Sequence, residues 1–151
     1  MIIYTDGSAH PNPGPGGFGV VVLDDNDNIL YAYSRQFKER VTNNEMELKA
    51  ILYALLNYGK ENPIVYSDSS YAVNTFNIWM NNWALNGWVK SDNKVPENLV
   101  LIQTYYEYQN KGYRIDLRKV KGHNGVFWNE IVDALATGEM TPEEVMKEYG
   151  K

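Results

Sequence analysis

The sequence predicts an α/β fold in which helices cover the faces of a mixed β-sheet. The predicted elements follow the order β-β-β-α-β-α-α-β-α, and an antiparallel meander followed by alternating strands and helices is typical of such a sheet. The 151 residues are enough for one domain with a sizeable core, and neither repeats nor an interdomain linker interrupt them. We therefore expect a single domain over residues 1–151.

Five short apolar runs predict the strands, over residues 1–5, 18–23, 29–37, 63–67 and 113–120. The acidic and amide side chains of residues 24–28 predict a hairpin turn between the second and third strands. Residues 10–17 are rich in proline and glycine, so they predict a structured loop rather than a helix. A phosphate-binding loop is the alternative, but the segment lacks the Gly-Lys-Ser/Thr ending of a P-loop.

Helical periodicity predicts helices over residues 42–58, 69–85, 96–110 and 127–137, with a short one at 141–149. Thr42 or Asn43 can cap the first helix, and Gly59 ends it. The polar segment 87–94 interrupts the helical pattern between the second and third helices.

Composition and charge exclude several classes of function. The net charge of −5, from 14 basic and 19 acidic residues, argues weakly against a polyanion partner, although basic residues cluster at 35–40 and 114–121. The chain has no cysteine, which excludes disulfides, thiolate zinc sites and cysteine nucleophiles. No apolar run approaches the roughly 18 residues of a membrane span. We expect a soluble, cytoplasmic protein without membrane contact.

Four acidic residues in separate stretches are the main functional signal. Asp6 and Asp68 are each expected where a strand leaves the sheet, so they share one edge if their strands are parallel neighbours. Glu47 and Asp133 lie in helical patterns, on faces without the apolar stripe, and Asp133 shares its face with Asn129.

Converging carboxylates would repel one another unless cations held them together. Hard divalent ions with oxygen ligands are the obvious candidates. Any one of the four acids alone could instead be a helix cap, a turn former or a solvated side chain.

Six motifs in register resemble ribonuclease H of the bacterial and eukaryotic type 1 class, over about residues 1–137. They are Tyr4-Thr5-Asp6-Gly7-Ser8, Asn12-Pro13-Gly14-Pro15-Gly16-Gly17-Phe18-Gly19, Thr42-Asn43-Asn44-Glu45-Met46-Glu47-Leu48, Ser67-Asp68-Ser69-Ser70-Tyr71, Val120-Lys121-Gly122-His123 and the segment from Asn129 to Ala136.

The resemblance implies a five-stranded sheet with three antiparallel and two parallel strands. It also implies an endonuclease that hydrolyses the RNA strand of RNA–DNA hybrids with two Mg²⁺ or Mn²⁺ ions, leaving 5′-phosphate and 3′-hydroxyl ends. Two metals about 4 Å apart can activate the water and stabilise the leaving oxygen.

The resemblance assigns each site residue a role. Asp6 would bridge the two ions, Asp68 would hold the ion on the nucleophile side, and Glu47 would lie near the ribose 2′-hydroxyl. Asp133 would complete the ligands on the more mobile side. His123 would transfer protons or assist product release, although a loop histidine is often only a surface residue.

Substrate contacts follow from the same resemblance. Asn12, Asn43 and Asn44 match positions that read the minor groove and the 2′-hydroxyls. Arg40 and Thr42 match a pocket for a DNA-strand phosphate. Ser70 stands where the family often has glutamine. Asn43 and Asn44 could instead merely cap a helix.

Asn129, Trp79 and Trp83 complete the expected substrate-binding residues, the tryptophans within a segment, residues 79–94, that resembles the family's handle. The alternative is that Trp79, Trp83 and Trp88 simply pack together. Residues 84–87 carry no lysine or arginine, so we expect a handle that grips the hybrid weakly.

Two other functions remain open at this point. The chain could be a non-catalytic hybrid-binding module, or a DNA-cutting nuclease of the same fold. All four carboxylates are present, which favours an active enzyme, and Asn43 and Asn44 favour hybrid cleavage. We expect a monomer without an obligate protein partner.

Overall fold

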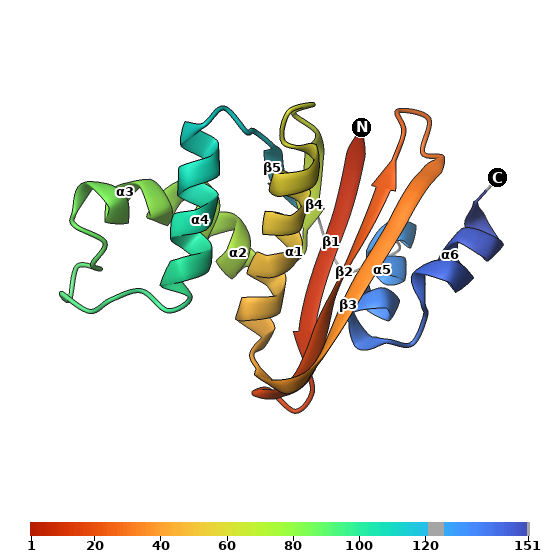
Figure 1. The fold of residues 1–151 in the computed structure, drawn as a ribbon, viewed down its shortest axis with the longest axis horizontal. Helices are drawn as coiled ribbons and strands as arrows, with labels where there is room; N and C mark the ends of the chain where they lie inside the picture. Colours follow the sequence, from red (N-terminus) through yellow and green to blue (C-terminus); the bar gives the residue numbers. More distant parts are fainter. Residues whose placement is uncertain (121–125, 151) are drawn as a thin grey trace.

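A five-stranded mixed sheet forms the centre of the molecule (Figure 1). The computed structural model describes residues 1–120 and 126–150. The strands are β1 (Ile2–Ala9), β2 (Gly14–Leu23), β3 (Ile29–Val41), β4 (Ile64–Ser67) and β5 (Asp116–Lys119), in the sheet order β3-β2-β1-β4-β5. β1, β2 and β3 pair antiparallel, whereas β4 is parallel to β1 and β5 is parallel to β4. The predicted fold class and strand directions are confirmed.

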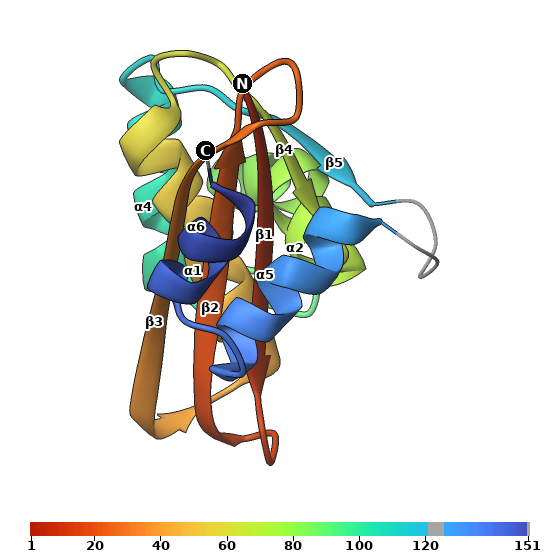
Figure 2. The ribbon, with the colours of Figure 1, turned by 90° about the vertical axis from the view of Figure 1, so that its right-hand side faces the viewer.

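Helices cover both faces of this sheet (Figures 1 and 2). On one face, α1 (Asn43–Tyr58) and α2 (Ser70–Asn74) lie next to the sheet, and α4 (Leu99–Asn110) packs beside α1. The π-helical turn η1 (Thr75–Trp79) continues α2 and leads into α3 (Met80–Leu85), which lies away from the sheet. The other face carries α5 (Phe127–Thr137) and α6 (Pro142–Tyr149). No helix in the described ranges is long and apolar enough to cross a bilayer.

Each face of the sheet has its own hydrophobic core. The larger cluster lies between the sheet and α1, α2 and α4, and includes Ile3, Val20, Leu55 and Phe76. The smaller cluster lies under α5 and α6. The two α5 residues Val132 and Leu135 are fully buried in it, which fixes the side of this helix that faces the sheet.

The first connection is shorter than the sequence predicts. β1 continues to Ala9 and β2 begins at Gly14, so the last four residues of the predicted 10–17 loop belong to a strand. Gly16 and Gly17 pair with Ala9 and Ser8 across the two strands. The proline and glycine content predicted a loop, but these glycines adopt strand conformation because β1 pairs with them.

The second predicted helix contains a π turn, because η1 separates α2 from α3. The third helix begins at Leu99 rather than at 96, after Asn98 with a φ of 60°. The fifth strand is limited to four residues by the length of β4, with which it pairs. α5 has its predicted bounds, and Thr42 is the N-cap of α1 as predicted.

Two glycines let helices approach the centre of the sheet. A Cβ on Gly7 would overlap the backbone of Met46 and Glu47 in α1. A Cβ on Gly19 would lie 2.6 Å from Leu135 Cβ and 2.8 Å from the Val132 carbonyl oxygen of α5. Both helices therefore lie directly against the strands, with no side chain between.

Gly7→Ala is expected to destabilise the protein by about 3 kcal/mol, because the methyl group would overlap the backbone of α1, which cannot change rotamer as a side chain can. Urea unfolding measures the loss. Gly87→Ala is the matched control: its Cβ would have open space, and only the left-handed φ of 68° costs roughly 1 kcal/mol. Equal losses in the two variants would refute the close-approach argument.

Candidate metal centre

The site forms where β4 stops and β1 continues. The pairing between these strands ends at Tyr4 and Tyr66, whereas β1 runs on to Ala9. Residues 6–9 of β1 therefore have no neighbouring strand on that side within the described sheet, and we call this segment the open edge. A strand edge has unpaired backbone donors. One of them, the Gly7 N–H, is accepted by Oε1 of Glu47.

Three carboxylates converge at the open edge. Asp6 comes from β1, Glu47 from α1 and Asp68 from the residue after β4. Each contributes a carboxylate oxygen, and these oxygens all lie within 4.8 Å of one another. Asp6 and Glu47 are only 6% and 7% exposed, whereas Asp68 is half-buried.

The positions of two acids differ from the prediction. Asp6 lies inside β1 rather than at its end, because β1 continues along β2 beyond the end of β4. Glu47 was expected on a face without apolar contacts, but it is buried. The close approach of α1 over Gly7 accounts for this, since it brings the Glu47 carboxylate against the open edge. Asp68 lies at the strand end as predicted.

Asp133 reaches the site from the opposite face of the sheet. Gly19 pairs with Asp6 in the β1–β2 register, and Val132 of α5 lies over Gly19. Asp133 follows Val132 and is exposed. Burial is the main cause that raises the pKa of Asp6, and the nearby charge of Asp133 adds to the rise. The fourth predicted acid thus joins the site beside the three-carboxylate cluster.

Burial and mutual repulsion oppose ionisation at this site. Desolvation raises the pKa of Asp6 from 3.8 to about 8, and the charges of Asp68 and Asp133 add to the rise. Desolvation also raises the pKa of Glu47 well above 4.5, and the negative charge of Asp6 raises it further. A divalent cation between the oxygens would remove the repulsion and favour the ionised forms.

The donor set fits a hard divalent ion. It consists of carboxylate oxygens alone, the ligands that Mg²⁺, Mn²⁺ and Ca²⁺ prefer. Asp6, Glu47 and Asp68 offer one oxygen each at mutual distances that a single ion can span. Asp133 is placed to contribute from α5.

The comparisons with known proteins agree with this geometry. The sequence model of the RNase H family matches residues 1–141. The chain belongs to the RNase H family. The family is divalent-metal dependent, in keeping with the carboxylate cluster.

Two curated relatives align over nearly the whole chain. The ribonuclease H of Thermoanaerobacter sp. (strain X514) is 38% identical over 144 residues, covering 91% of this chain and 88% of the relative. The ribonuclease HI of Rickettsia prowazekii (strain Madrid E) is 36% identical over 153 residues, covering 99% and 97%. Among solved structures, LC11-RNase H1 in complex with RNA/DNA hybrid matches with a TM-score of 0.67 at 25% identity, covering 96% of this chain and 98% of that one. The predicted resemblance to ribonuclease H is confirmed.

Several residues expected to contact substrate in this family also hold the local structure. Asn43 Oδ1 accepts a hydrogen bond from the Ala9 N–H at 2.6 Å, and Asn12 Oδ1 accepts one from the Asn43 N–H at 3.0 Å. Thr42 Oγ1 accepts from the Glu45 N–H, so Thr42 caps α1. These bonds fix the first turn of α1 to the end of β1, beside the metal centre. Capping and substrate contact are compatible, because the amide nitrogens of both asparagines can still donate.

The remaining predicted residues come from four different elements. Arg40 is exposed on β3, Asn44 is half-buried in the first turn of α1, and Ser70 is exposed at the start of α2. Asn129 is half-buried on α5, and its Oδ1 has no hydrogen-bond partner in the described structure. His123 lies outside the described residues.

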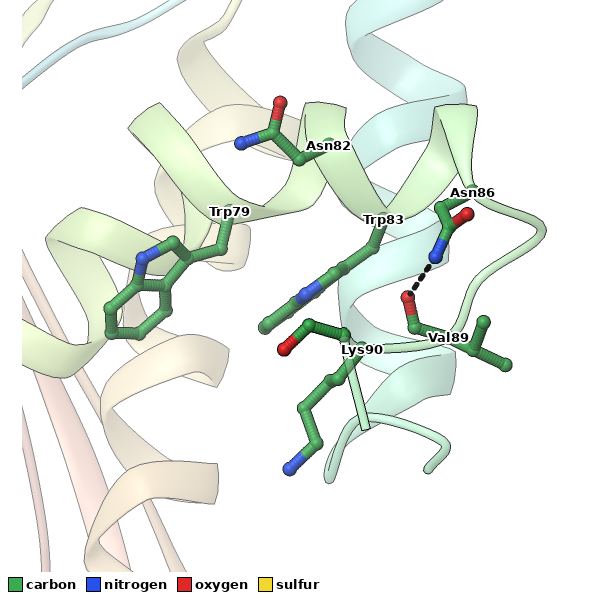
Figure 3. A pocket seen from close by; sticks show the side chains of 7 residues that line it. Trp79, Asn82, Trp83, Asn86, Val89 and Lys90 are labelled. Carbon is green, nitrogen blue, oxygen red and sulfur yellow. Dashed lines mark hydrogen bonds between the residues drawn. The ribbon is translucent and has the colours of Figure 1, made fainter. Parts of the chain in front are cut away.

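The segment that resembles the family's handle, residues 79–94, contributes to an apolar hollow of about 590 Å³ (Figure 3). Trp79 and Trp83 lie along it with ring centroids 6.1 Å apart, and Lys90 from the returning segment lies beside Trp83. Trp88 instead packs edge-on against Tyr106 of α4, at 5.2 Å. The ring contacts thus pair Trp79 with Trp83 and Trp88 with Tyr106, while Trp83 and Trp88 both pack against the larger core. Lys90 adds a cation to this hollow although residues 84–87 carry none, because the chain returns towards Trp83 after α3.

Asp6→Asn is expected to stabilise the protein when no metal is present. Because the pKa of Asp6 rises from 3.8 to about 8 on folding, the free energy of unfolding of the wild type falls as the pH rises from about 4 towards 8. A neutral Asn does not lose stability in this way. At pH 8 the free energy of unfolding of Asp6→Asn should therefore exceed that of the wild type by more than about 1 kcal/mol, given about 1.4 kcal/mol per pKa unit. Urea unfolding with a chelator at pH 5 and pH 8 measures it.

Added Mg²⁺ should make the wild type more stable than Asp6→Asn, because the ion stabilises only a folded protein that binds it. Asp92→Asn, an exposed acid in the handle segment, is the control and should leave the pH dependence unchanged. An Asp6→Asn protein less stable than the wild type at pH 8 without metal would contradict this account of the site.

Proposed function

We propose that the protein is an endonuclease that hydrolyses the RNA strand of RNA–DNA hybrids, leaving 5′-phosphate and 3′-hydroxyl ends. One observation carries the proposal: Asp6, Glu47 and Asp68 meet at the open edge, with Asp133 beside them, in a chain of the RNase H family. The complex of LC11-RNase H1 with an RNA/DNA hybrid supports this choice of substrate.

Asp6, Glu47, Asp68 and Asp133 would hold two divalent ions, with Mg²⁺ the first choice and Mn²⁺ an alternative. When bound, such ions lower the pKa of the attacking water and stabilise the leaving 3′-oxygen. The chain offers no cysteine, and the proposed reaction needs no protein nucleophile. Catalysis therefore depends on how the carboxylates are placed.

The four carboxylates differ in how firmly the fold holds them. Asp6 is fixed within a strand, and Glu47 is fixed by its hydrogen bond with the Gly7 N–H. Asp68 is half-buried at a strand end, where Ser69 caps the following helix. Asp133 is exposed, so it has the most freedom to follow the substrate. In the proposed reaction Asp6 would serve both ions, Asp68 would hold the ion that activates the water, and Glu47 would lie towards the ribose.

Recognition of the RNA strand is assigned to the asparagines at the end of the sheet. Asn12, Asn43 and Asn44 gather where β1 meets α1, next to the metal centre. Their amide groups are suited to 2′-hydroxyls, which donate and accept hydrogen bonds and distinguish RNA from DNA. Arg40 and Thr42 would receive a phosphate of the DNA strand, and His123 would assist proton transfer or product release.

A monomer acting in the cytoplasm without an obligate protein partner completes the proposal. Size-exclusion chromatography with light scattering tests the oligomeric state.

The function is tested with Mg²⁺ and labelled RNA–DNA hybrid, RNA duplex and DNA duplex. Cleavage of the RNA strand in the hybrid alone is expected, and Asp68→Asn should reduce its rate by at least about 1,000-fold, because one ion loses a charged ligand. Asp27→Asn, an exposed acid in the β2–β3 hairpin, serves as the matched control and should retain activity. Cleavage of duplex DNA would favour the DNA nuclease, and hybrid binding without cleavage would favour the non-catalytic module.

A weakly charged handle should respond strongly to added lysines. Leu85 is 88% exposed at the tip of the handle, and Asn86 is exposed next to it. Leu85→Lys/Asn86→Lys should tighten hybrid binding and steepen the dependence of log Kd on log salt, by up to about 0.9 for each new phosphate contact. Fluorescence anisotropy in an Asp68→Asn background measures both effects without cleavage.

The control for the handle adds the same charge elsewhere. Asn26→Lys/Leu30→Lys places two lysines at the exposed β2–β3 hairpin, at the end of the sheet away from the metal centre. An equal change of salt slope in both double variants would show that net charge, not the handle, sets the slope.

A further inference from the structure

Gln36 of β3 ties the C-terminal end of α5 to the sheet. Its Nε2 donates to the carbonyl oxygens of Leu135 at 3.0 Å and Ala136 at 3.2 Å. The last carbonyls of a helix lack donors from within the helix. The Gly138 N–H also donates to Leu135, at 3.3 Å, whereas the Ala136 carbonyl depends on Gln36 among the described residues. The glutamine therefore acts as a side-chain cap supplied from the sheet.

Close contact between α5 and the sheet makes this reach possible. Gln36 pairs with Gly17 in the β2–β3 register. A Cβ on Gly17 would lie 2.6 Å from Gln36 Nε2 and 2.6 Å from the Ala136 carbonyl oxygen. The end of the helix thus sits on a strand position without a side chain, and the neighbouring strand supplies the donor.

The tether is the main polar link between this helix and the sheet. Within residues 1–120 and 126–150, no other side chain of the sheet donates a hydrogen bond to the α5 backbone. At the opposite end, the N-cap residue Val126 makes no side-chain cap. Polar contact therefore holds α5 to the sheet at its C-terminal end.

Asp133 lies within one helical turn of both tethered carbonyls, since a turn spans about 3.6 residues. Apolar packing of Val132 and Leu135 holds α5 on the sheet but restrains sliding along it only weakly, because such contacts are non-directional. The hydrogen bonds from Gln36 are directional, so they restrain the sliding of α5 along the sheet.

We infer that Gln36 is a positioning residue for the reaction: it fixes the last turn of α5 and, through it, the placement of the Asp133 carboxylate beside Asp6. The inference rests on the proposed function. Gln36 itself touches neither the carboxylates nor the hybrid.

The test compares two substitutions of Gln36 by steady-state cleavage of the hybrid at 25 °C. Gln36→Leu keeps the size and removes the donor. It should lower kcat by about 10-fold with KM nearly unchanged, the size of effect seen when residues that orient metal ligands are removed. Gln36→Lys restores a donor that suits helix C-terminal carbonyls and should keep kcat within about twofold of the wild type. Gln103→Leu, a half-buried glutamine of α4, is the control and should change nothing.

A double-mutant cycle separates positioning from general stability. If Gln36 acts through Asp133, Gln36→Leu should not lower kcat further in an Asp133→Asn background. Hydrogen exchange of the metal-free protein adds a measurement independent of catalysis. The amides of residues 134–140 should exchange faster in Gln36→Leu, while those of α1 keep the wild-type rate.

The outcomes of these experiments distinguish failure of the inference from failure of the proposed function. An active wild type with unchanged kcat in Gln36→Leu overturns the inference, as does an equal loss of kcat with and without Asp133. A wild type that does not cleave the hybrid refutes the proposed function instead. In that case unchanged exchange in residues 134–140 would also refute the tether.

Discussion

Repulsion among buried carboxylates is the constraint that the rest of the structure has to meet. Asp6, Glu47 and Asp68 are held with oxygens within 4.8 Å of one another, and two of them are more than nine-tenths buried. Such an arrangement is unfavourable without a cation, because burial first and the neighbouring charges second raise the pKa of both Asp6 and Glu47. The carboxylate site therefore lowers the stability of the protein, and the surrounding fold must be rigid enough to keep the carboxylates together.

The sheet and two helices provide that rigidity from three directions. The early end of β4 creates the open edge, and the Gly7 N–H that it leaves unpaired holds the Glu47 carboxylate. Gly7 and Gly19 have the same role on opposite faces of the sheet: Gly7 allows the close approach of α1, and Gly19 allows that of α5. At these two glycines the helices lie close against the strands, while the C-terminal end of α5 is also held by the Gln36 side chain.

Substrate recognition and structural support overlap at the end of the sheet. Asn12 and Asn43 join β1 to the first turn of α1 through their side-chain oxygens. The same residues are placed beside the metal centre, so a change in either one alters both the site and its support. The handle is different. Its tryptophans line an open hollow with Lys90, away from the carboxylates, and its charge can vary without disturbing the metal centre.

The sequence by itself predicted the fold class and four candidate carboxylates, because apolar periodicity and short motifs can be read along the chain, and the resemblance to ribonuclease H added the strand directions. It also predicted Asp68 at a strand end and offered Thr42 or Asn43 as the cap of α1, of which the structure shows Thr42. It could not show that Asp6 lies inside a strand or that Glu47 is buried, since both depend on where β4 stops beside β1 and how closely α1 approaches. The tether from Gln36 to α5 joins residues 99 and 100 positions apart. Only the tertiary structure decided these features, because strand pairing and helix packing bring together groups whose separation in the chain carries no local signal.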